Sequence, residues 1–302
     1  MKLFSFPIII GIIFALFYPA LALDLIQFPF FLLMVLMFIA TLTSNINSEE
    51  IKKIKYSELF WSIVFIQFLF PFTQAIFSYV LIKDQRFFQG LLAESLTPIA
   101  LVAPFFTGII GGNVVFSFVL MAINTLITPI VLPLFLSYFE LGHWPINYST
   151  LTKELIILCF LPIFLGLIFK FILRNKIDFI RKFAPSINSL VLAVLIYTLF
   201  GAAYLKINFL MIKKIEILMI LLICTFQDFG ILFLAKKFCG SFFKEEKNFK
   251  AFYISASMKN VAIVSSVLLL YDPRSALPAV LCFIPHALLF EYWWWKRREV
   301  NV

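Results

Sequence analysis

Long apolar runs, separated by short polar segments, make up almost the whole chain. This hydrophobic pattern predicts ten helices, each close to the roughly twenty residues that a bilayer requires. The predicted helices cover residues 3–21, 26–42, 59–81, 87–109, 114–138, 155–173, 187–205, 215–234, 252–270 and 276–295. The chain is therefore expected to be an all-α polytopic membrane protein with a single membrane domain over residues 1–302.

The first apolar run also has features of a signal peptide. Lys2 lies in front of it, and Ala20-Leu-Ala22 resembles a cleavage site. Because the run is longer than the core of about 7–15 residues that is usual in signal peptides, we expect a retained first helix.

Composition and charge agree with a membrane location. Hydrophobic residues make up 63% of the chain and the mean hydropathy is +1.02, whereas soluble domains are about 45–50% apolar. With Lys259 set aside, 17 Lys and Arg residues lie on the side of the ten-helix topology that holds both termini, and seven lie on the other. Basic residues mark cytoplasmic loops. Both termini are therefore expected in the cytoplasm, with the inner membrane as the location if the protein is bacterial, and nucleic acid is not expected as a partner.

The chain offers little material for catalysis or for a metal site. Its four cysteines are scattered, and its two histidines are His143 and His286, so no disulfide or metal framework is apparent. The sequence contains no Gly-rich phosphate loop and no Gly-x-Ser-x-Gly elbow. We therefore expect no catalytic residue, no metal and no cofactor, and a membrane enzyme is the least favoured class.

The two halves of the chain resemble each other. Ten helices divide into two sets of five, over about residues 1–145 and 146–302, and an odd number of spans in each set inverts the second relative to the first. Gln67 in the third predicted helix has a counterpart in Gln227-Asp228 of the eighth. The sequence thus predicts two inverted five-helix repeats.

The fourth and ninth predicted helices are the least regular. Pro98 and Pro104 are expected to break or kink the fourth. The ninth has Lys259 near its middle, and because a charge at the centre of a membrane helix costs about 2.5–3.5 kcal/mol, this lysine must face a protein-lined or watery interior. Discontinuous helices at matching positions of two halves indicate a transporter's midplane binding site. Polar neighbours that could satisfy backbone groups freed by a local break in the ninth helix are Ser255, Ser257 and Asn260.

Several strings along the chain resemble the bile acid:sodium symporter family. On the ninth helix the family usually has a Glu followed two residues later by Gly-Met-Gln-Asn, and here Met258 and Asn260 match. The Glu, the Gly and the Gln are replaced by Ser255, Ser257 and Lys259. Further strings that resemble the family, in the family's order, are the polar turn 44–55, Gln67-Phe-Leu-Phe-Pro71, Thr97-Pro98 through Ala103-Pro104, Gly112-Asn113-Val114 with Ser117, Asn124-Thr125-Leu126 with Pro129, and Leu161-Pro162 with Leu165-Gly166.

The resemblance implies a fold and an activity. It implies a core domain from helices 3, 4, 5, 8, 9 and 10, in which the broken helices 4 and 9 cross, and a separate panel domain from helices 1, 2, 6 and 7. It also implies that the solute binds between these domains. Members of the family move organic anions, commonly with sodium.

The sodium ligands are where this chain departs from the family. In one family site the ligands are a Ser-Asn pair at the helix 4 break, hydroxyl residues of helix 5 and the Glu of helix 9. The matching positions here are Ala103, Pro104, Ser117, Met121 and Ser255. In the second site Gln67 is retained, but Ser255 and Lys259 replace the Glu and the Gln. Hard cations need several oxygen ligands and a fixed ammonium repels them, so sodium coupling is not expected.

We therefore expect a secondary active transporter or facilitator of a small organic anion that works by alternating access without sodium. Lys259 would replace the sodium ion as a tethered cation, hold the helix crossing together and attract the anion, and it could also bind and release a proton. The alternatives are an arsenite- or auxin-type efflux carrier, disfavoured because helix 4 lacks a cysteine, and a non-transporting scaffold or sensor derived from a transporter. Candidate residues of the solute and ion sites are Lys259, Gln67, Ser255, Ser257, Asn260, Ser117, Asn113, Asp228 and Glu94.

Other polar residues in the predicted helices have competing interpretations. Asp228 could neutralise Lys259 or relay a proton, and a structural ion pair is the equal alternative. Glu94 could face an aqueous cavity, although an interfacial carboxylate is the preferred interpretation. For Asn124 and His286 we prefer hydrogen-bonded packing roles, and for Glu291, beside the tryptophan belt, an interfacial one.

Overall fold

The computed structural model describes residues 5–44, 48–139, 147–173, 176–207 and 212–300. Every regular element in these ranges is helical, which confirms the predicted all-helical class. Of the ten predicted helices, the fourth and the ninth are interrupted, and the first and the second are short. Six of the described helices are long and apolar enough to cross a membrane, namely Tyr56–Leu81, Val114–Tyr138, Tyr148–Ile172, Ile177–Lys206, Lys214–Lys237 and Pro273–Lys296.

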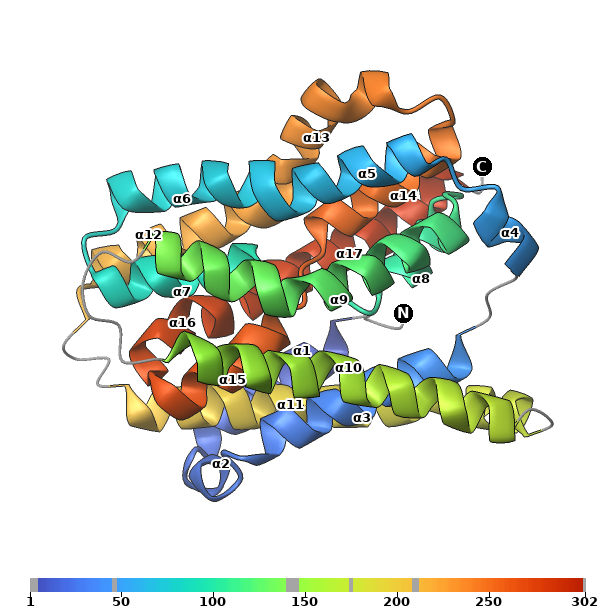
Figure 1. Ribbon diagram of the computed structural model, residues 1–302. Helices are drawn as coiled ribbons and strands as arrows, with labels where there is room; N and C mark the ends of the chain where they lie inside the picture. Colours follow the sequence, from blue (N-terminus) through green and yellow to red (C-terminus); the bar gives the residue numbers. More distant parts are fainter. Residues whose placement is uncertain (1–4, 45–47, 140–146, 174–175, 208–211, 301–302) are drawn as a thin grey trace.

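One layer of the molecule is built from two segments that are far apart in the sequence (Figure 1). It contains α1 (Phe6–Phe17), α2 (Ala20–Asp24), α3 (Phe28–Thr43), α10 (Tyr148–Ile172) and α11 (Ile177–Lys206). Within this layer α1 packs on α11, and α3 packs on both α10 and α11. The helices α10 and α11 are apolar over most of their surface and bury few residues, as expected for helices that face lipid on one side.

The remaining helices form the second layer. It contains α5 (Tyr56–Val64), the π-helical turn η1 (Phe65–Leu69), α6 (Phe70–Leu81), α7 (Gln85–Ser95), α8 (Ala103–Ile109), α9 (Val114–Tyr138), α12 (Lys214–Thr225), the π-helical turn η3 (Phe226–Gly230), α13 (Ile231–Cys239), α14 (Glu246–Ser257), α15 (Val261–Tyr271), α16 (Pro273–Leu281) and α17 (Phe283–Val300). The short α4 (Ser48–Lys52) and the 3-10 turn η4 (Gly240–Phe242) lie in connections. Both π-helical turns interrupt long helices, and such turns are frequent at functional sites.

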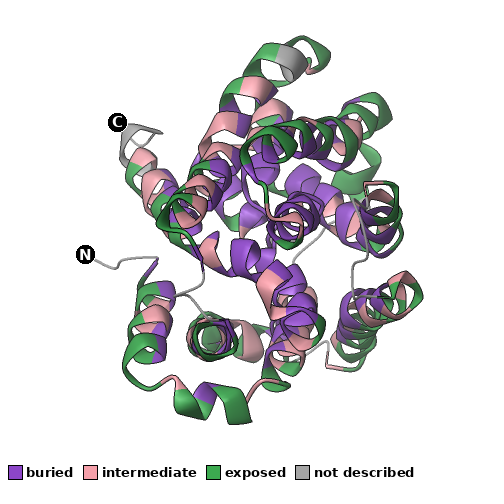
Figure 2. Ribbon diagram, turned by 90° about the vertical axis from the view of Figure 1, so that its left-hand side faces the viewer, coloured by how far each residue is buried: buried purple, intermediate pink, exposed green. Residues whose placement is uncertain are grey.

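Buried residues gather in the middle of the second layer (Figure 2). All residues of α7 from Phe87 to Ser95 are buried, and so are all residues of α15 from Val261 to Leu269. A helix that is buried all round must pack closely against its neighbours. At Gly90 a Cβ atom would lie 2.0 Å from the Ser275 carbonyl oxygen, so only glycine allows α7 to approach α16 this closely. The interrupted helices therefore lie in the core.

Polar contacts join the connections at both ends of the helices. At one end the contacts are Lys55–Glu245 (2.8 Å), the Asn113 amide to the Lys247 carbonyl (2.9 Å) and Lys170 Nζ to the Ser44 carbonyl (2.7 Å). At the other end they are Arg274–Asp84 (2.6 Å), Arg86–Asp272 (3.5 Å) and Tyr271–Glu154 (3.0 Å). Connections that are distant in sequence therefore meet in two separate groups.

Several predicted helix boundaries were wrong. The first predicted helix ends early, at Phe17, because Pro19 follows and restricts the residue before it. The seventh and ninth begin early, at Ile177 and Glu246, and each has a salt bridge within its first turns. Hydropathy alone misses such polar turns because they extend a helix beyond its apolar span.

Candidate functional site

The interrupted helices meet where each of them leaves the helical conformation. The chain is extended between α7 and α8 and again between α14 and α15, and Ile99 and Lys259 form an isolated antiparallel bridge. The hydrogen bonds of this bridge run from the Ala100 amide to the Met258 carbonyl and from the Asn260 amide to the Pro98 carbonyl, both at 2.7 Å. We call residues 96–102 and 258–260 the crossing. The crossing satisfies by mutual pairing the backbone groups that a broken membrane helix would otherwise leave without partners.

The first break has a local cause in the sequence. Pro98 has no amide hydrogen, and it disfavours the helical conformation at Thr97 before it. Pro104 behaves differently from the prediction, because it lies in the first turn of α8. Proline is well tolerated there, since the first amides of a helix have no partner within it. Pro104 therefore begins a helix and does not kink one.

The second break occurs without proline or glycine. The Lys259 carbonyl accepts a hydrogen bond from His286 Nε2 at 2.9 Å, and its neighbours pair with the other strand of the crossing. The expectation that nearby serines would satisfy the freed groups is confirmed for Ser257, whose Oγ donates at 2.9 Å to the Ile254 carbonyl in the last turn of α14. Ser255 does not follow it, because its Oγ pairs with Ser117 Oγ at 2.9 Å.

Lys259 is buried in the crossing, with an exposed fraction of 1%. Its Nζ donates to the carbonyls of Ile66 and Thr97, each at 3.2 Å, and lies 6.0 Å from the centre of the Phe70 ring. The Thr97 carbonyl follows the C-terminal end of α7, where the partial negative charge of a helix favours a cation. The Ile66 carbonyl comes from the π-helical turn η1. The ammonium group is thus bound by backbone oxygens of two interrupted helices.

Gln67 and Asn124 lie beside this lysine site. Asn124 Oδ1 accepts from the Ile99 amide at 3.0 Å, so Asn124 reaches the crossing itself and its role is more than packing between helices. Gln67 Nε2 donates to Thr128 Oγ1 at 3.0 Å. Among the described residues, Gln67 Oε1 has no hydrogen-bond partner although it is buried. A buried acceptor without a donor indicates a place where a ligand or a water molecule can bind.

Two other candidate asparagines have different positions. Asn260 contributes its backbone amide to the crossing. Asn113 caps α9, because its Oδ1 accepts from the Phe116 amide at 3.0 Å, and its Nδ2 donates to Asn248 at 2.8 Å. No hydrogen bond joins Asn113 to the crossing among the described residues, so its contacts are those of a helix cap.

A second polar cluster is joined to the Lys259 backbone carbonyl through His286. His286 Nδ1 is 2.8 Å from Asp228 Oδ2 and 3.6 Å from Cys282 Sγ. Cys282 Sγ is in turn 3.5 Å from Glu94 Oε1, which also accepts a hydrogen bond from Gln227. Cys282 is the single residue between α16 and α17, and helical hydrogen bonds continue through it within the long helix Pro273–Lys296. We call Asp228, His286, Cys282 and Glu94 the acid–histidine cluster.

This cluster corrects several interpretations made from the sequence. Asp228 has its ion-pair contact with His286 and not with Lys259. Glu94 is fully buried, so it is neither interfacial nor facing an aqueous cavity in this conformation. His286 is hydrogen bonded, as expected, but its partners are an acid and the crossing. Glu291 accepts from Ser5 Oγ at 2.8 Å and joins the two ends of the described chain.

The cluster contains atoms that could bind a metal ion. Ligand atoms of Asp228, Cys282 and His286 lie within 4.8 Å of one another. Ligands of one tetrahedral ion with bonds of about 2.0–2.1 Å lie about 3.3 Å apart, whereas the histidine and aspartate atoms are 2.8 Å apart. That distance is typical of a hydrogen bond. The arrangement therefore fits a shared proton better than a metal ion.

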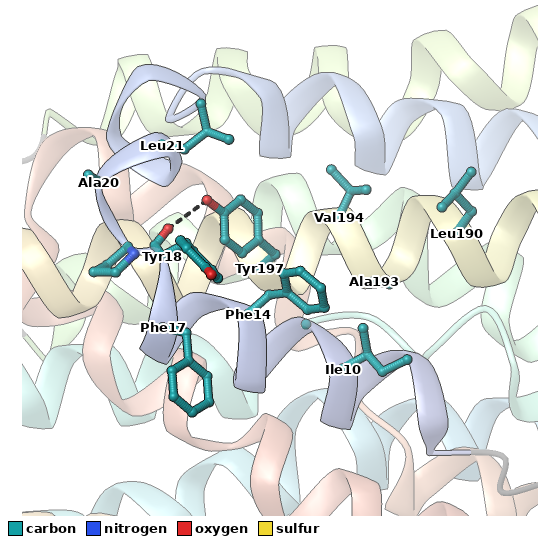
Figure 3. Close-up of a pocket in the computed structure, with 12 residues that line it drawn as sticks. Ile10, Phe14, Phe17, Tyr18, Ala20, Leu21, Leu190, Ala193, Val194 and Tyr197 are labelled. Atoms are coloured by element: carbon teal, nitrogen blue, oxygen red, sulfur yellow. Dashed lines mark hydrogen bonds between the residues drawn. The ribbon is translucent and has the colours of Figure 1, made fainter.

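A groove of about 740 Å³ lies elsewhere, along α1 and α11 (Figure 3). Its lining is apolar and includes Phe14, Leu190 and Tyr197, and the Tyr197 hydroxyl donates to the Tyr18 carbonyl at 2.8 Å. None of the candidate site residues lines it. Side chains such as Phe14 and Leu190 are exposed, so this groove belongs to the outer apolar surface and not to the crossing.

Comparison with known proteins identifies the family. Residues 30–213 match the model of the Sodium Bile acid symporter family, which is more than half of the chain. The chain belongs to this family. It is therefore an integral membrane protein and a secondary transporter, not an enzyme. No curated protein sequence matches the chain. The family match ends at residue 213, before the second half of the crossing.

Three residues that contribute to these sites were not predicted as site residues. Thr128 was not considered, Cys282 was considered only for a disulfide or metal framework, and for Asn124 a packing role was preferred to a position at the crossing. Threonine and cysteine are common in membrane helices, and only a contact across helices distinguishes these two. For Asn124 a signal was present, because a buried amide in an apolar helix requires a partner.

Proposed function

We propose that this family member transports a small organic anion by alternating access without sodium, and that Lys259 takes the place of the sodium ion. Family membership supplies the transporter class and the membrane. The solute, the coupling and the role of Lys259 are our proposal. The observation that carries it is the position of the Lys259 ammonium group between two backbone carbonyls of the crossing.

Backbone carbonyl oxygens are the kind of ligand that binds a hard cation. Here two of them bind a cation that belongs to the protein. A second positive charge about 4 Å away would be repelled by about 4 kcal/mol at an effective dielectric constant near 20. A bound sodium ion would also need further oxygens, and Ser255 and Ser117 already pair with each other. These contacts support sodium independence.

The same cation supports an anionic solute. Lys259 lies two residues before the first residue of α15, and the first amides of a helix have no partner within it and attract negative charge. Arrangements of this kind hold anionic groups in transporters with discontinuous helices. In the present conformation the crossing is closed, since Thr97, Ile99 and Lys259 are at most 1% exposed. Solute access therefore requires the surroundings of the crossing to open.

The arrangement of the helices supports the proposed movement. We propose that the layer of α1, α2, α3, α10 and α11 is the panel and that the other layer is the core, with the solute between them. Two inverted repeats are supported by π-helical turns at Phe65–Leu69 and Phe226–Gly230 and by a break in the helix that follows each. The polar contacts between connections form two separate groups, as expected if successive helices cross the membrane in alternating directions. We further propose cytoplasmic termini, because most basic residues belong to that side.

A thermal-unfolding screen in detergent tests the transport function. Taurocholate and a panel of smaller organic acids would be added with and without sodium chloride across a range of pH. A carrier is stabilised by an acid that it binds, by about 2.7 kcal/mol at a hundred times the dissociation constant. A scaffold or sensor without a solute site would show no stabilisation by any acid, which would contradict the proposal.

Proteoliposomes test the role of Lys259 directly. Uptake of the stabilising acid would be measured with and without a sodium gradient, for the wild type and for Lys259→Gln. Lys53→Gln, a change of an exposed lysine near α4, is the matched control. We expect the same uptake with and without a sodium gradient in the wild type and in Lys53→Gln, and loss of uptake in Lys259→Gln. Uptake that is driven by sodium and unaffected by Lys259→Gln would refute the tethered-cation role.

A further inference from the structure

The acid–histidine cluster contains a pair of groups that must share a proton. His286 Nε2 is 2.9 Å from the Lys259 carbonyl oxygen, and a carbonyl can only accept, so Nε2 carries a hydrogen. The other ring nitrogen, Nδ1, is 2.8 Å from Asp228 Oδ2. A carboxylate oxygen and a bare imidazole nitrogen are both acceptors. A contact this short therefore needs one further proton, either on Asp228 or on Nδ1.

The groups that face this pair come from several elements. Asp228 comes from η3, as does Gln227, which donates to Glu94 of α7, and Cys282 lies between α16 and α17. Cys224 of α12 lies within hydrogen-bonding reach of Cys282 and contacts the Pro278 carbonyl at 3.7 Å. The Lys259 ammonium faces the other side of the crossing, towards the Ile66 and Thr97 carbonyls. Two acids and one imidazole thus face one another with thiols between them.

Loss of the shared proton would place two acceptors, Asp228 Oδ2 and His286 Nδ1, 2.8 Å apart with no hydrogen between them. Asp228 and His286 are 0% and 2% exposed, so no solvent compensates in the closed conformation. Among the described residues, both oxygens of Asp228 and Glu94 Oε2 lack a hydrogen bond of regular geometry, so the 2.8 Å contact is an ion-pair contact. A buried acceptor without a donor is costly, so the pair can lose its proton only if it separates. Because His286 also holds the Lys259 carbonyl, that separation would disturb the crossing.

We propose that Asp228 and His286 form a binding site for one exchangeable proton, whose release is tied to the opening of the crossing. The bound proton lies between Asp228 Oδ2 and His286 Nδ1, and its release leaves a carboxylate and a neutral imidazole. Glu94 is the next acceptor, and it is reached through Cys282. Given the proposed function, on which this last step rests, the site is where proton movement is coupled to solute movement.

Thermal unfolding of the full-length protein in lipid nanodiscs, between pH 5 and 9 and without any solute, tests the site. In the unfolded chain an imidazole loses its proton near pH 6.5, whereas the folded pair keeps one. The folded state then binds more protons than the unfolded state above about pH 7, so stability falls as the pH rises. We expect the melting temperature of the wild type to fall by about 2–4 °C per pH unit in this range.

Two variants remove the shared proton in different ways. In Asp228→Asn the amide can donate to Nδ1, and in His286→Gln the amide can still donate to the Lys259 carbonyl, so at least one fold-preserving variant is expected. Both should lose the excess pH slope of the wild type. Ser265→Ala is the control, because that hydroxyl bonds only to a carbonyl of its own helix, and it should keep the slope. Equal slopes in the wild type and both variants would overturn the proposal.

The same measurement separates other occupants and other failures. If a chelator lowers the melting temperature of the wild type but not of Asp228→Asn, the cluster holds a metal ion and the proton site is wrong. No solute is present, so a missing slope counts against the proton site even if an organic acid is transported. A present slope supports the proton site even if the screen for transported acids fails, in which case only the proposed function is lost.

Discussion

The three-residue connection between α14 and α15 contacts two regions with different chemistry. On one side the Lys259 side chain donates to backbone carbonyls, and the surrounding side chains are amides and hydroxyls. On the other side the Lys259 backbone carbonyl accepts from His286, which leads to two buried acids. Among the described residues no acid lies within ion-pair distance of the Lys259 ammonium group, and Glu94 is the acid that acts on it electrostatically from further away. A fixed charge lies on one side, and an exchangeable proton is proposed on the other.

This separation explains how one residue can serve both regions. In the family pattern the position of Lys259 is a Gln beside a Glu, and here Ser255 replaces that Glu. A carboxylate at this position would neutralise the lysine. Its absence leaves the ammonium group with neutral ligands only, so that its charge remains available to an anionic solute. The acids Glu94 and Asp228 are directed instead to His286, Cys282 and Gln227.

Removing the fixed charge should have the largest effect. In Lys259→Met an apolar chain of similar length replaces the cation. Since a charge pair about 4 Å apart is worth about 4 kcal/mol at an effective dielectric constant of 20, uptake of an organic anion should fall by about 100-fold or more. Uptake into proteoliposomes measures this, with Lys53→Met as the control. Unchanged uptake in Lys259→Met would mean that the positive charge of Lys259 does not attract the anionic solute.

Removing the hydrogen bond between Asn124 of α9 and the crossing should have the next largest effect. Asn124→Leu removes the acceptor of the Ile99 amide and leaves a buried donor unpaired, which costs about 1–3 kcal/mol. Asn124→Asp keeps an acceptor oxygen and should lose less stability. Thermal unfolding of both variants measures the difference. If Asn124→Leu and Asn124→Asp lose the same stability, this contact does not hold the crossing.

The two regions also differ in how far sequence could predict them. The first break was predictable because proline acts locally, and Lys259 was conspicuous because a charge in an apolar helix is costly. The second break depends on pairing with an extended segment about 160 residues earlier in the chain, as the bridge between Ile99 and Lys259 shows. The contact of Asp228 with His286 depends on the packing of η3 against α17. No periodicity in the sequence indicates which acid a buried histidine will contact.

Restoring sodium ligands tests whether the fixed cation of Lys259 has replaced a bound sodium ion. The double variant Ser255→Glu with Lys259→Gln restores the two family side chains and removes the fixed cation. With the retained Gln67 it should acquire sodium-dependent stabilisation, of about 1.4 kcal/mol at ten times the dissociation constant. Melting temperatures in sodium and in potassium chloride would show it. Lys259→Gln alone lacks the carboxylate and should not respond.

If the double variant is as indifferent to sodium as the wild type, the remaining differences must also exclude the ion. Those differences are Ala103 and Pro104 at the first break and Met121 on α9, which supply no side-chain oxygen. Loss of sodium binding would then be distributed over the crossing and would not depend on the exchange of a mobile cation for a fixed one. The outcome therefore decides between one substitution and several.

The smallest effect is expected at the contact between Ser117 and Ser255. It joins α9 to α14 at 2.9 Å at positions where the resemblance implies sodium ligands, and among the described residues no hydrogen bond joins either hydroxyl to Lys259. Ser117→Ala should cost about 0.5–1.5 kcal/mol, the usual value of one neutral hydrogen bond, and Ser255→Ala about the same. Because both variants lose the same bond, the double variant should lose about as much free energy of unfolding as either single variant. Strictly additive losses would mean that each hydroxyl has its own partner, as the two halves of a sodium site would.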